Sequence, residues 1–137
     1  MKKILLGALF LFTINIVFAQ NRPAYVLYNA KGKKVSFKKM MKVLAEKDVV
    51  MFGEYHNNPI SHWLELTVAK ELSAVKPLVL GAEMFEADNQ LPLNNYLAGK
   101  ISAKGLDSTA RLWRNYKTDY APLVNFAKEN HLKFIAS

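Results

Sequence analysis

The sequence contains no cysteine among its 137 residues. This absence excludes disulfide bonds, thiolate metal sites, cysteine nucleophiles and the acylated N-terminal cysteine that anchors a lipoprotein. The motifs GxGxxG, GxxxxGK(S/T), GxSxG and HExxH are also missing. Nucleotide binding and serine hydrolysis are therefore not favoured. Six glycines and five prolines are too few for a low-complexity chain.

The composition is that of one globular domain with an excess of positive charge. Hydrophobic residues make up 51% of the chain, and 19 basic against 11 acidic residues give a net charge of +8. Seven lysines fall in one short stretch: Lys31, Lys33, Lys34, Lys38, Lys39, Lys42 and Lys47. No aromatic residues are interleaved with them at stacking spacing, so we expect no nucleic-acid partner. We expect a solvated face, with association to a membrane surface or an acidic partner as the alternative.

The N-terminus has the pattern of a secretory signal peptide. Lys2 and Lys3 precede an apolar run from Ile4 to Phe18, and Val17 and Ala19 suit a signal peptidase. The run is shorter than the roughly 20 residues that span a bilayer, which favours cleavage over an anchor helix. We therefore expect cleavage after Ala19 and an exported protein, periplasmic or extracellular, whose domain begins at residue 20.

Strand and helix patterns alternate along the rest of the chain. Strands are predicted over residues 24–28, 49–52, 78–82 and from 133, with the runs 49–52 and 78–82 buried on both faces. Helices are predicted from residue 37, over 59–75, from 88 to 97, around 109–116 and from 121 to 131. Ser36 and Asn58 are candidate N-caps, and Pro59 suits a first helical position. This order predicts an α/β fold with a parallel sheet and helical crossovers. We expect residues 20–137 to be the N-terminal part of a larger domain, incomplete at its C-terminus.

Polar side chains follow both of the predicted interior strands. Glu54 and His56 come directly after residues 49–52, and Glu83 follows residues 78–82. Ligands bind beyond the carboxyl ends of strands in open α/β sheets, so we expect these three side chains to converge. They would lie near the N-terminus of the helix that begins at Pro59, with His62 in its first turn.

Two carboxylates and one or two imidazoles suit more than one kind of chemistry. They can bind a divalent metal ion, with His56, Glu54 and Glu83 as the candidate ligands. They can act as a general acid/base pair. They can also contact haem, with a tyrosine as a further ligand type; Tyr55, Tyr116 and Tyr120 are the tyrosines considered. Residue spacing alone does not choose among the three.

The motifs around these residues resemble those of the ChaN-like haem-binding family, part of the wider Tiki and erythromycin-esterase-like group. The resemblance rests on residues 52–59, His62, residues 80–85, Gln90, Trp113, Tyr116 and residues 120–123. It implies a parallel α/β fold, an exported or outer-membrane-associated location, haem binding linked to iron uptake, and a homodimer that holds the haem. Residues 53–56 also resemble the GxxH signature of Tiki-type metalloproteases, which implies metal or acid/base roles for Glu54, His56 and Glu83.

Two departures limit what the resemblance transfers. Without a cysteine there is no site for a lipid anchor, and family members run well beyond residue 137, so the tyrosine that ligates the iron is not assigned. We predict an exported haem-binding protein linked to haem and iron uptake. Its haem-contacting residues are predicted to be Glu54, His56, His62 and Glu83, with Tyr55 as a further candidate. The alternative is a metal-dependent or acid/base hydrolase that uses Glu54, His56 and Glu83.

Overall fold

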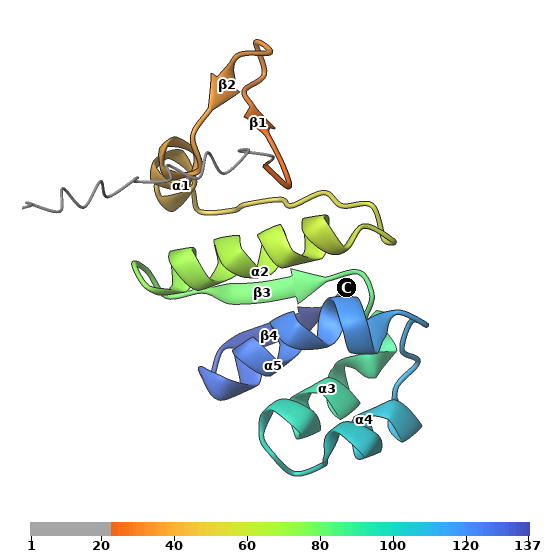
Figure 1. Ribbon diagram of the computed structural model, residues 1–137. Coiled ribbons are helices and arrows are strands. Elements are labelled where there is room, and N and C mark those ends of the chain that lie inside the picture. The colour runs from red at the N-terminus through yellow and green to blue at the C-terminus, as the bar shows by residue number, and fades with distance from the viewer. Residues whose placement is uncertain (1–22) are drawn as a thin grey trace, which may run out of the picture.

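The computed structural model describes residues 23–137. The predicted signal peptide, residues 1–19, lies outside this range. In chain order the elements are β1 (Leu27–Tyr28), β2 (Lys34–Val35), α1 (Phe37–Ala45), α2 (Pro59–Ser73), β3 (Val79–Ala82), the 3-10 helix η1 (Ala87–Asn89), α3 (Gln90–Leu97), α4 (Ala103–Thr109), the π-helix η2 (Tyr116–Tyr120), α5 (Ala121–Glu129) and β4 (Lys133–Ala136) (Figure 1). Within the described residues, no helix is long and apolar enough to cross a membrane.

The two clearest helix-start signals of the sequence are confirmed by the caps. The Asn58 side chain accepts hydrogen bonds from the backbone N–H groups of Ile60 and Ser61, and Pro59 is the first residue of α2. The Ser36 hydroxyl accepts from the backbone N–H of Lys39 at the start of α1. Such a cap contributes about 1 kcal/mol to helix stability. The residue at which α2 begins is thus determined by Asn58 and Pro59, which lie at its first turn.

The predicted parallel strand pair is confirmed. β3 and β4 are parallel, with Val79 opposite Lys133 and Ala82 opposite Ala136, and the connection between them runs through α3, α4 and α5. The Gln90 side chain extends the pairing of β4, because it donates to the Phe134 carbonyl and accepts from the Ala136 N–H. The predicted strand 24–28 is shorter than expected: β1 forms an antiparallel hairpin with β2.

The strand predicted over residues 49–52 does not form, and this prediction was wrong. Val49 is 73% exposed and Met51 is 90% exposed. Among the described residues no strand pairs with this segment, and a cleft lies between it and β3. An apolar run forms a buried strand only where a neighbouring strand takes up its backbone hydrogen bonds. The apolar run is present in the sequence, but residues 23–137 contain no strand that pairs with it.

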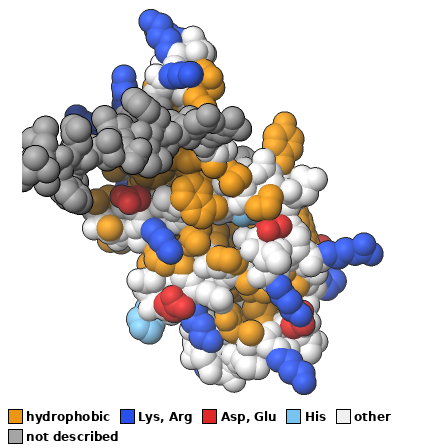
Figure 2. Space-filling model, viewed as in Figure 1, with side chains coloured by type: hydrophobic (Ala, Val, Ile, Leu, Met, Phe, Trp, Pro, Cys, Tyr) orange, Lys and Arg blue, Asp and Glu red, His pale blue; other side chains and the backbone are white. Residues whose placement is uncertain are grey.

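A second correction concerns the face of the sheet opposite the helices. Residues 78–82 were expected to be buried on both faces, but exposure alternates along β3, and Val79 is 59% exposed. The inward side chains of β4, Phe134 and Ala136, are buried, whereas Ile135 is 36% exposed. Within residues 23–137 the helices therefore cover only one face of the β3–β4 pair. Figure 2 shows hydrophobic side chains gathered on the surface around α2 and lysines projecting from the β1–β2 hairpin.

The core lies between the β3–β4 pair and the helices that follow β3. Its largest fully buried side chains are Phe85, Phe134, Met84, Leu93, Leu106 and Val124. The Phe85 ring contacts the rings of Phe134 and Tyr116 edge to face, each with 5.9 Å between centroids. These contacts hold the end of β3 against η2, which carries side chains of the candidate site.

The helix predicted around residues 109–116 is displaced toward the N-terminus. α4 begins after Ser102, whose hydroxyl accepts from the Gly105 N–H, and the backbone is extended at Ala110. The next residue, Arg111, donates its backbone N–H to the buried Asn89 side chain at 2.8 Å, and its guanidinium pairs with Glu86 and Asp88. This tertiary anchor ends the helix and directs the chain into η2.

Candidate functional site

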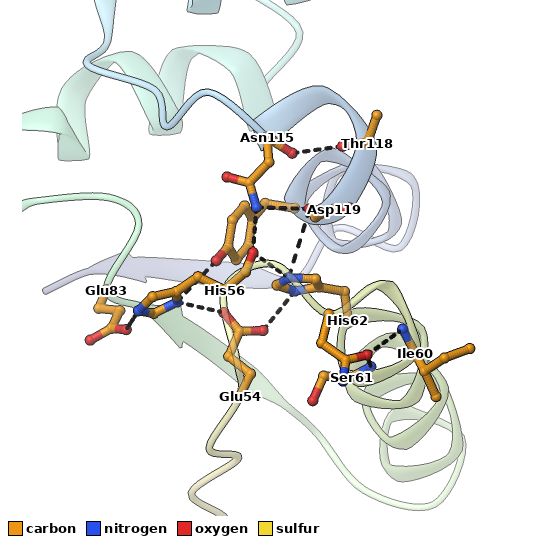
Figure 3. A network of polar contacts seen from close by, with 11 residues as sticks. Glu54, His56, Ile60, Ser61, His62, Glu83, Asn115, Thr118 and Asp119 are labelled. Carbon is orange, nitrogen blue, oxygen red and sulfur yellow. Dashed lines mark hydrogen bonds and ion pairs between the residues drawn. The ribbon is translucent and has the colours of Figure 1, made fainter. Parts of the chain in front are cut away.

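The site begins with the segment that connects residue 53 to α2. The Tyr55 carbonyl accepts a backbone hydrogen bond from Asn58, which closes a turn before the helix. Two side chains converge on the carbonyl of His56: Asn115 from just before η2, at 2.6 Å, and the Nε2 atom of His62 from α2, at 3.1 Å. The loop that carries Glu54 and His56 is thus fixed to two helices (Figure 3).

His56 lies between two carboxylates. Its Nδ1 atom is 3.6 Å from Glu54 Oε1 and 3.3 Å from the hydroxyl of Tyr120, whereas its Nε2 atom is 3.5 Å from Glu83 Oε1 (Figure 3). The ring packs edge to face against Trp113, with 4.7 Å between centroids. The structure therefore brings Glu54, His56 and Glu83 together. The His56 side chain is 54% exposed, so a ligand can reach its Nε2 side.

His62 is placed differently, inside the protein. Its side chain is 3% exposed, and its Nδ1 atom lies 2.6 Å from Glu54 Oε2. The Tyr120 ring packs edge to face against it, and Asp119 Oδ2 is 3.9 Å from its Nε2 atom. His62 is close to Glu54 as expected, but it is not among the residues that line the cleft beside β3. Tyr55 is also absent from that lining and is 78% exposed.

Glu65 belongs to the same polar cluster and was missed from the sequence. Burial in the first place, and the neighbouring Glu54 carboxylate in the second, raise the pKa of Glu65 from 4.5 to about 7, while His62 acts in the opposite direction. Residues 62 and 65 are three positions apart on α2 and therefore share a face of the helix. That spacing is visible in the sequence, but only the tertiary fold shows that the face is buried.

The residues of η2 complete the surroundings of the site. Burial, followed by interaction with Glu54, raises the pKa of Tyr120 above its usual range, so this phenol stays protonated. Asn115 donates to Asp119 Oδ2 at 2.7 Å, which positions that carboxylate beside His62. From the sequence, Tyr120 was considered as an iron ligand and was among the residues of the family resemblance, whereas Asn115 and Asp119 were not identified.

A cleft of about 1020 Å³ runs alongside β3. Its two long walls are residues 47–54 and residues 76–84, and α2 contributes Glu65, Val68, Ala69 and Leu72. Most of the wall is apolar. One end of the cleft, which we call the polar end, carries Glu54, His56, Glu83 and Tyr120. The other, which we call the lysine end, carries Lys47 and Lys76 together with Asp48. The volume is at the upper end of the range of small-molecule and cofactor sites, about 300–1,000 Å³.

Comparison with known proteins finds one matching family and one solved structure with a similar fold. Residues 40–137 match the family model described as haem-binding uptake, Tiki superfamily, ChaN. The fold is similar to that of a solved structure described as "Cofacial heme binding to ChaN of Campylobacter jejuni", with a TM-score of 0.65 and 23% sequence identity. The match covers 82% of this chain and 47% of that chain, so this chain spans about half the length of its structural neighbour. No curated protein matches this chain.

Proposed function

Because this chain belongs to the haem-binding uptake family of ChaN in the Tiki superfamily, we propose that it binds haem in the cleft beside β3 and serves haem and iron uptake. The single observation that carries the proposal is the form of the cleft. It combines long apolar walls with an accessible imidazole at the polar end and cationic side chains at the lysine end.

Each part of the cleft suits a part of the haem molecule. The macrocycle is flat and apolar, and burying it against the walls formed by residues 49–52, Val79 and Leu80 removes apolar surface from water. The two propionates are anions, which ammonium groups bind well. The Lys76 ammonium already donates to the carbonyls of Ala45 and Lys47, and it has a third N–H to offer.

His56 is the residue that we propose for contact with the haem iron. Its Nδ1 side faces Glu54 and the Tyr120 hydroxyl, which orient the ring from within the protein. Its Nε2 side faces Glu83, whose side chain is 70% exposed and free to move away. An imidazole held at one nitrogen and accessible at the other has the arrangement of an iron or zinc ligand.

The proposal is tested by altering the apolar wall without altering the polar end. Val79→Glu places a carboxylate on the exposed side of β3, in the lining of the cleft. It should weaken haem binding at least tenfold, because the macrocycle would cover a charge and the propionates would be repelled. Val75→Glu is the matched control, since Val75 is 67% exposed and does not line the cleft. Equal affinity of the two variants in an absorbance titration would contradict this placement of haem.

We also propose that the protein is exported and cleaved after Ala19. The support is the sequence pattern of residues 1–19 alone, with its two lysines and apolar run. N-terminal sequencing of the protein recovered from the periplasm or medium should give Gln20 as the first residue. An intact Met1 on protein retained inside the cell would contradict the proposal.

A hydrolase is the second candidate, and one observation favours it. The Nε2 atom of His56 lies 3.5 Å from the Glu83 carboxylate, at an accessible end of the cleft. A general base must be accessible in this way, because it has to reach a proton of the substrate. In that case ester hydrolysis by the purified chain should be lost in His56→Ala. The haem proposal, by contrast, requires no bond to be broken.

A further inference from the structure

A second group of potential ligands lies next to the polar end of the cleft and is more buried than that end. Glu54, His62 and Glu65 each bring one ligand atom within 4.8 Å of the other two. His62 and Glu65 come from the same face of α2, and Glu54 comes from the segment before it. Glu54 and Glu65 also line the cleft, so the group can be reached from solvent.

The hydrogen bonding of His62 determines what its other nitrogen can do. Nε2 lies 3.1 Å from the His56 carbonyl, and since a carbonyl only accepts, Nε2 carries the proton. In the neutral ring Nδ1 is then an acceptor, and it lies 2.6 Å from Glu54 Oε2, which is also an acceptor. Both atoms are buried, and neither has a hydrogen-bond partner within the described part of the chain. A proton held between the two atoms joins them as an ion pair at this distance, whereas a zinc ion would lie about 2.0–2.2 Å from each atom, so binding it would move the two atoms more than about 3 Å apart.

Glu65 adds a second negative group to this position. Among residues 23–137 its side chain takes part in no hydrogen bond and no ion pair, although it is half-buried. Burying a carboxylate without a partner costs free energy, and a divalent cation offsets two such charges at once.

We propose that Glu54, His62 and Glu65 form a binding site for a divalent transition-metal ion of the zinc type. One imidazole nitrogen and two carboxylate oxygens are ligands that such an ion prefers, and a fourth position would remain open toward the cleft. The Nε2–H bond to a backbone carbonyl is the usual second contact of a metal-ligating histidine, which fixes the ring with Nδ1 toward the ion.

This ligand set differs from the one expected from the sequence. In Glu54, His56 and Glu83, the two carboxylates face opposite nitrogens of one imidazole ring, at 3.6 and 3.5 Å. Two groups on opposite sides of a ring do not surround a common point. The site proposed here shares only Glu54 with that set, and it does not depend on haem.

The test is a zinc titration of the full chain after treatment with EDTA, followed by isothermal calorimetry, with circular dichroism to show that each variant is folded. The wild type should bind one Zn²⁺ per chain. Glu65→Gln and His62→Gln should each weaken binding at least tenfold. Glu71→Gln, which removes a carboxylate from the same helix outside the proposed ligand set, should leave the affinity unchanged.

Three outcomes would overturn the proposal. The first is a folded wild type that binds no Zn²⁺, which would leave a proton between Glu54 and His62. The second is binding that survives Glu65→Gln and His62→Gln. The third is binding that is weakened by Glu83→Gln as strongly as by Glu65→Gln, which would place the ion at the polar end of the cleft instead.

Discussion

Glu65 provides a quantitative test of the buried polar cluster through the pH dependence of stability. Its pKa is raised from 4.5 to about 7 in the folded protein. The folded state therefore binds the proton more tightly than the unfolded state between these values, and stability falls as the pH rises through this window. Above pH 7 the carboxylate is ionised in both the folded and the unfolded state, and the loss of folding stability caused by burying its charge is then complete.

The magnitude follows from the shift. One pKa unit corresponds to about 1.36 kcal/mol, so the full shift would correspond to about 3 kcal/mol. Glu65 is only partly buried, and solvent screening at its exposed side reduces the expected penalty to about 1–2 kcal/mol. Glu65→Gln keeps the shape of the protonated side chain and removes the ionisation. In EDTA the variant should therefore become more stable than the wild type as the pH rises from 5 to 8.

Urea unfolding followed by circular dichroism at pH 5, 6, 7 and 8 measures this difference. The advantage of Glu65→Gln should grow up to about pH 7 and then level off. Glu71→Gln serves as the control, because Glu71 lies on the same helix outside the buried cluster, and no comparable trend is expected. A Glu65→Gln variant that is less stable than the wild type at pH 8, or a difference that is constant with pH, would refute the reasoning.

Three further predictions concern the caps, the core and the assembly. Asn58→Ala removes the side chain that accepts from Ile60 and Ser61 and should cost about 1 kcal/mol in urea unfolding, whereas unchanged stability would show that the cap does not set the start of α2. Leu93→Ala should lower the free energy of unfolding by about 2–5 kcal/mol, because Leu93 is fully buried. Leu91→Ala in the same helix should lower it by less than about 0.5 kcal/mol, because Leu91 is 68% exposed. Similar losses of stability in the two variants would contradict the described core. Haem should convert the chain to a homodimer in light scattering, because the cleft borders the exposed side chains of Val49 and Met51, and a monomer at saturating haem would count against that assembly.

The elements that could be predicted from the sequence are those fixed by local chemistry. α2 follows from Asn58 and Pro59, whose effects act within one helical turn. β3 and β4 were found as apolar runs, and their parallel pairing follows from the helices between them. The run at residues 49–52 has a similar composition, but no strand within residues 23–137 pairs with it, and an apolar run alone does not determine whether a pairing strand is present.

The candidate site was predicted in part for a similar reason. Glu54 and Glu83 meet at His56 because both segments run along the same cleft and end at the same place, although only one of them is a strand. Glu65 and Asp119 were missed, although Glu65 lies three residues after His62 and Asp119 directly precedes Tyr120. What gives them a role is burial beside His62, and burial is a property of the tertiary fold.

Haem binding in the cleft, with His56 at the iron, is the central claim, and an absorbance titration of the chain with haem tests it most directly. The wild type should show saturable binding with a shifted Soret band, and His56→Ala should lower the affinity at least tenfold. His131→Asn is the matched control, because it removes the other exposed histidine of the three in the chain. A folded wild type with no Soret shift, or equal binding by His56→Ala and His131→Asn, would contradict the claim.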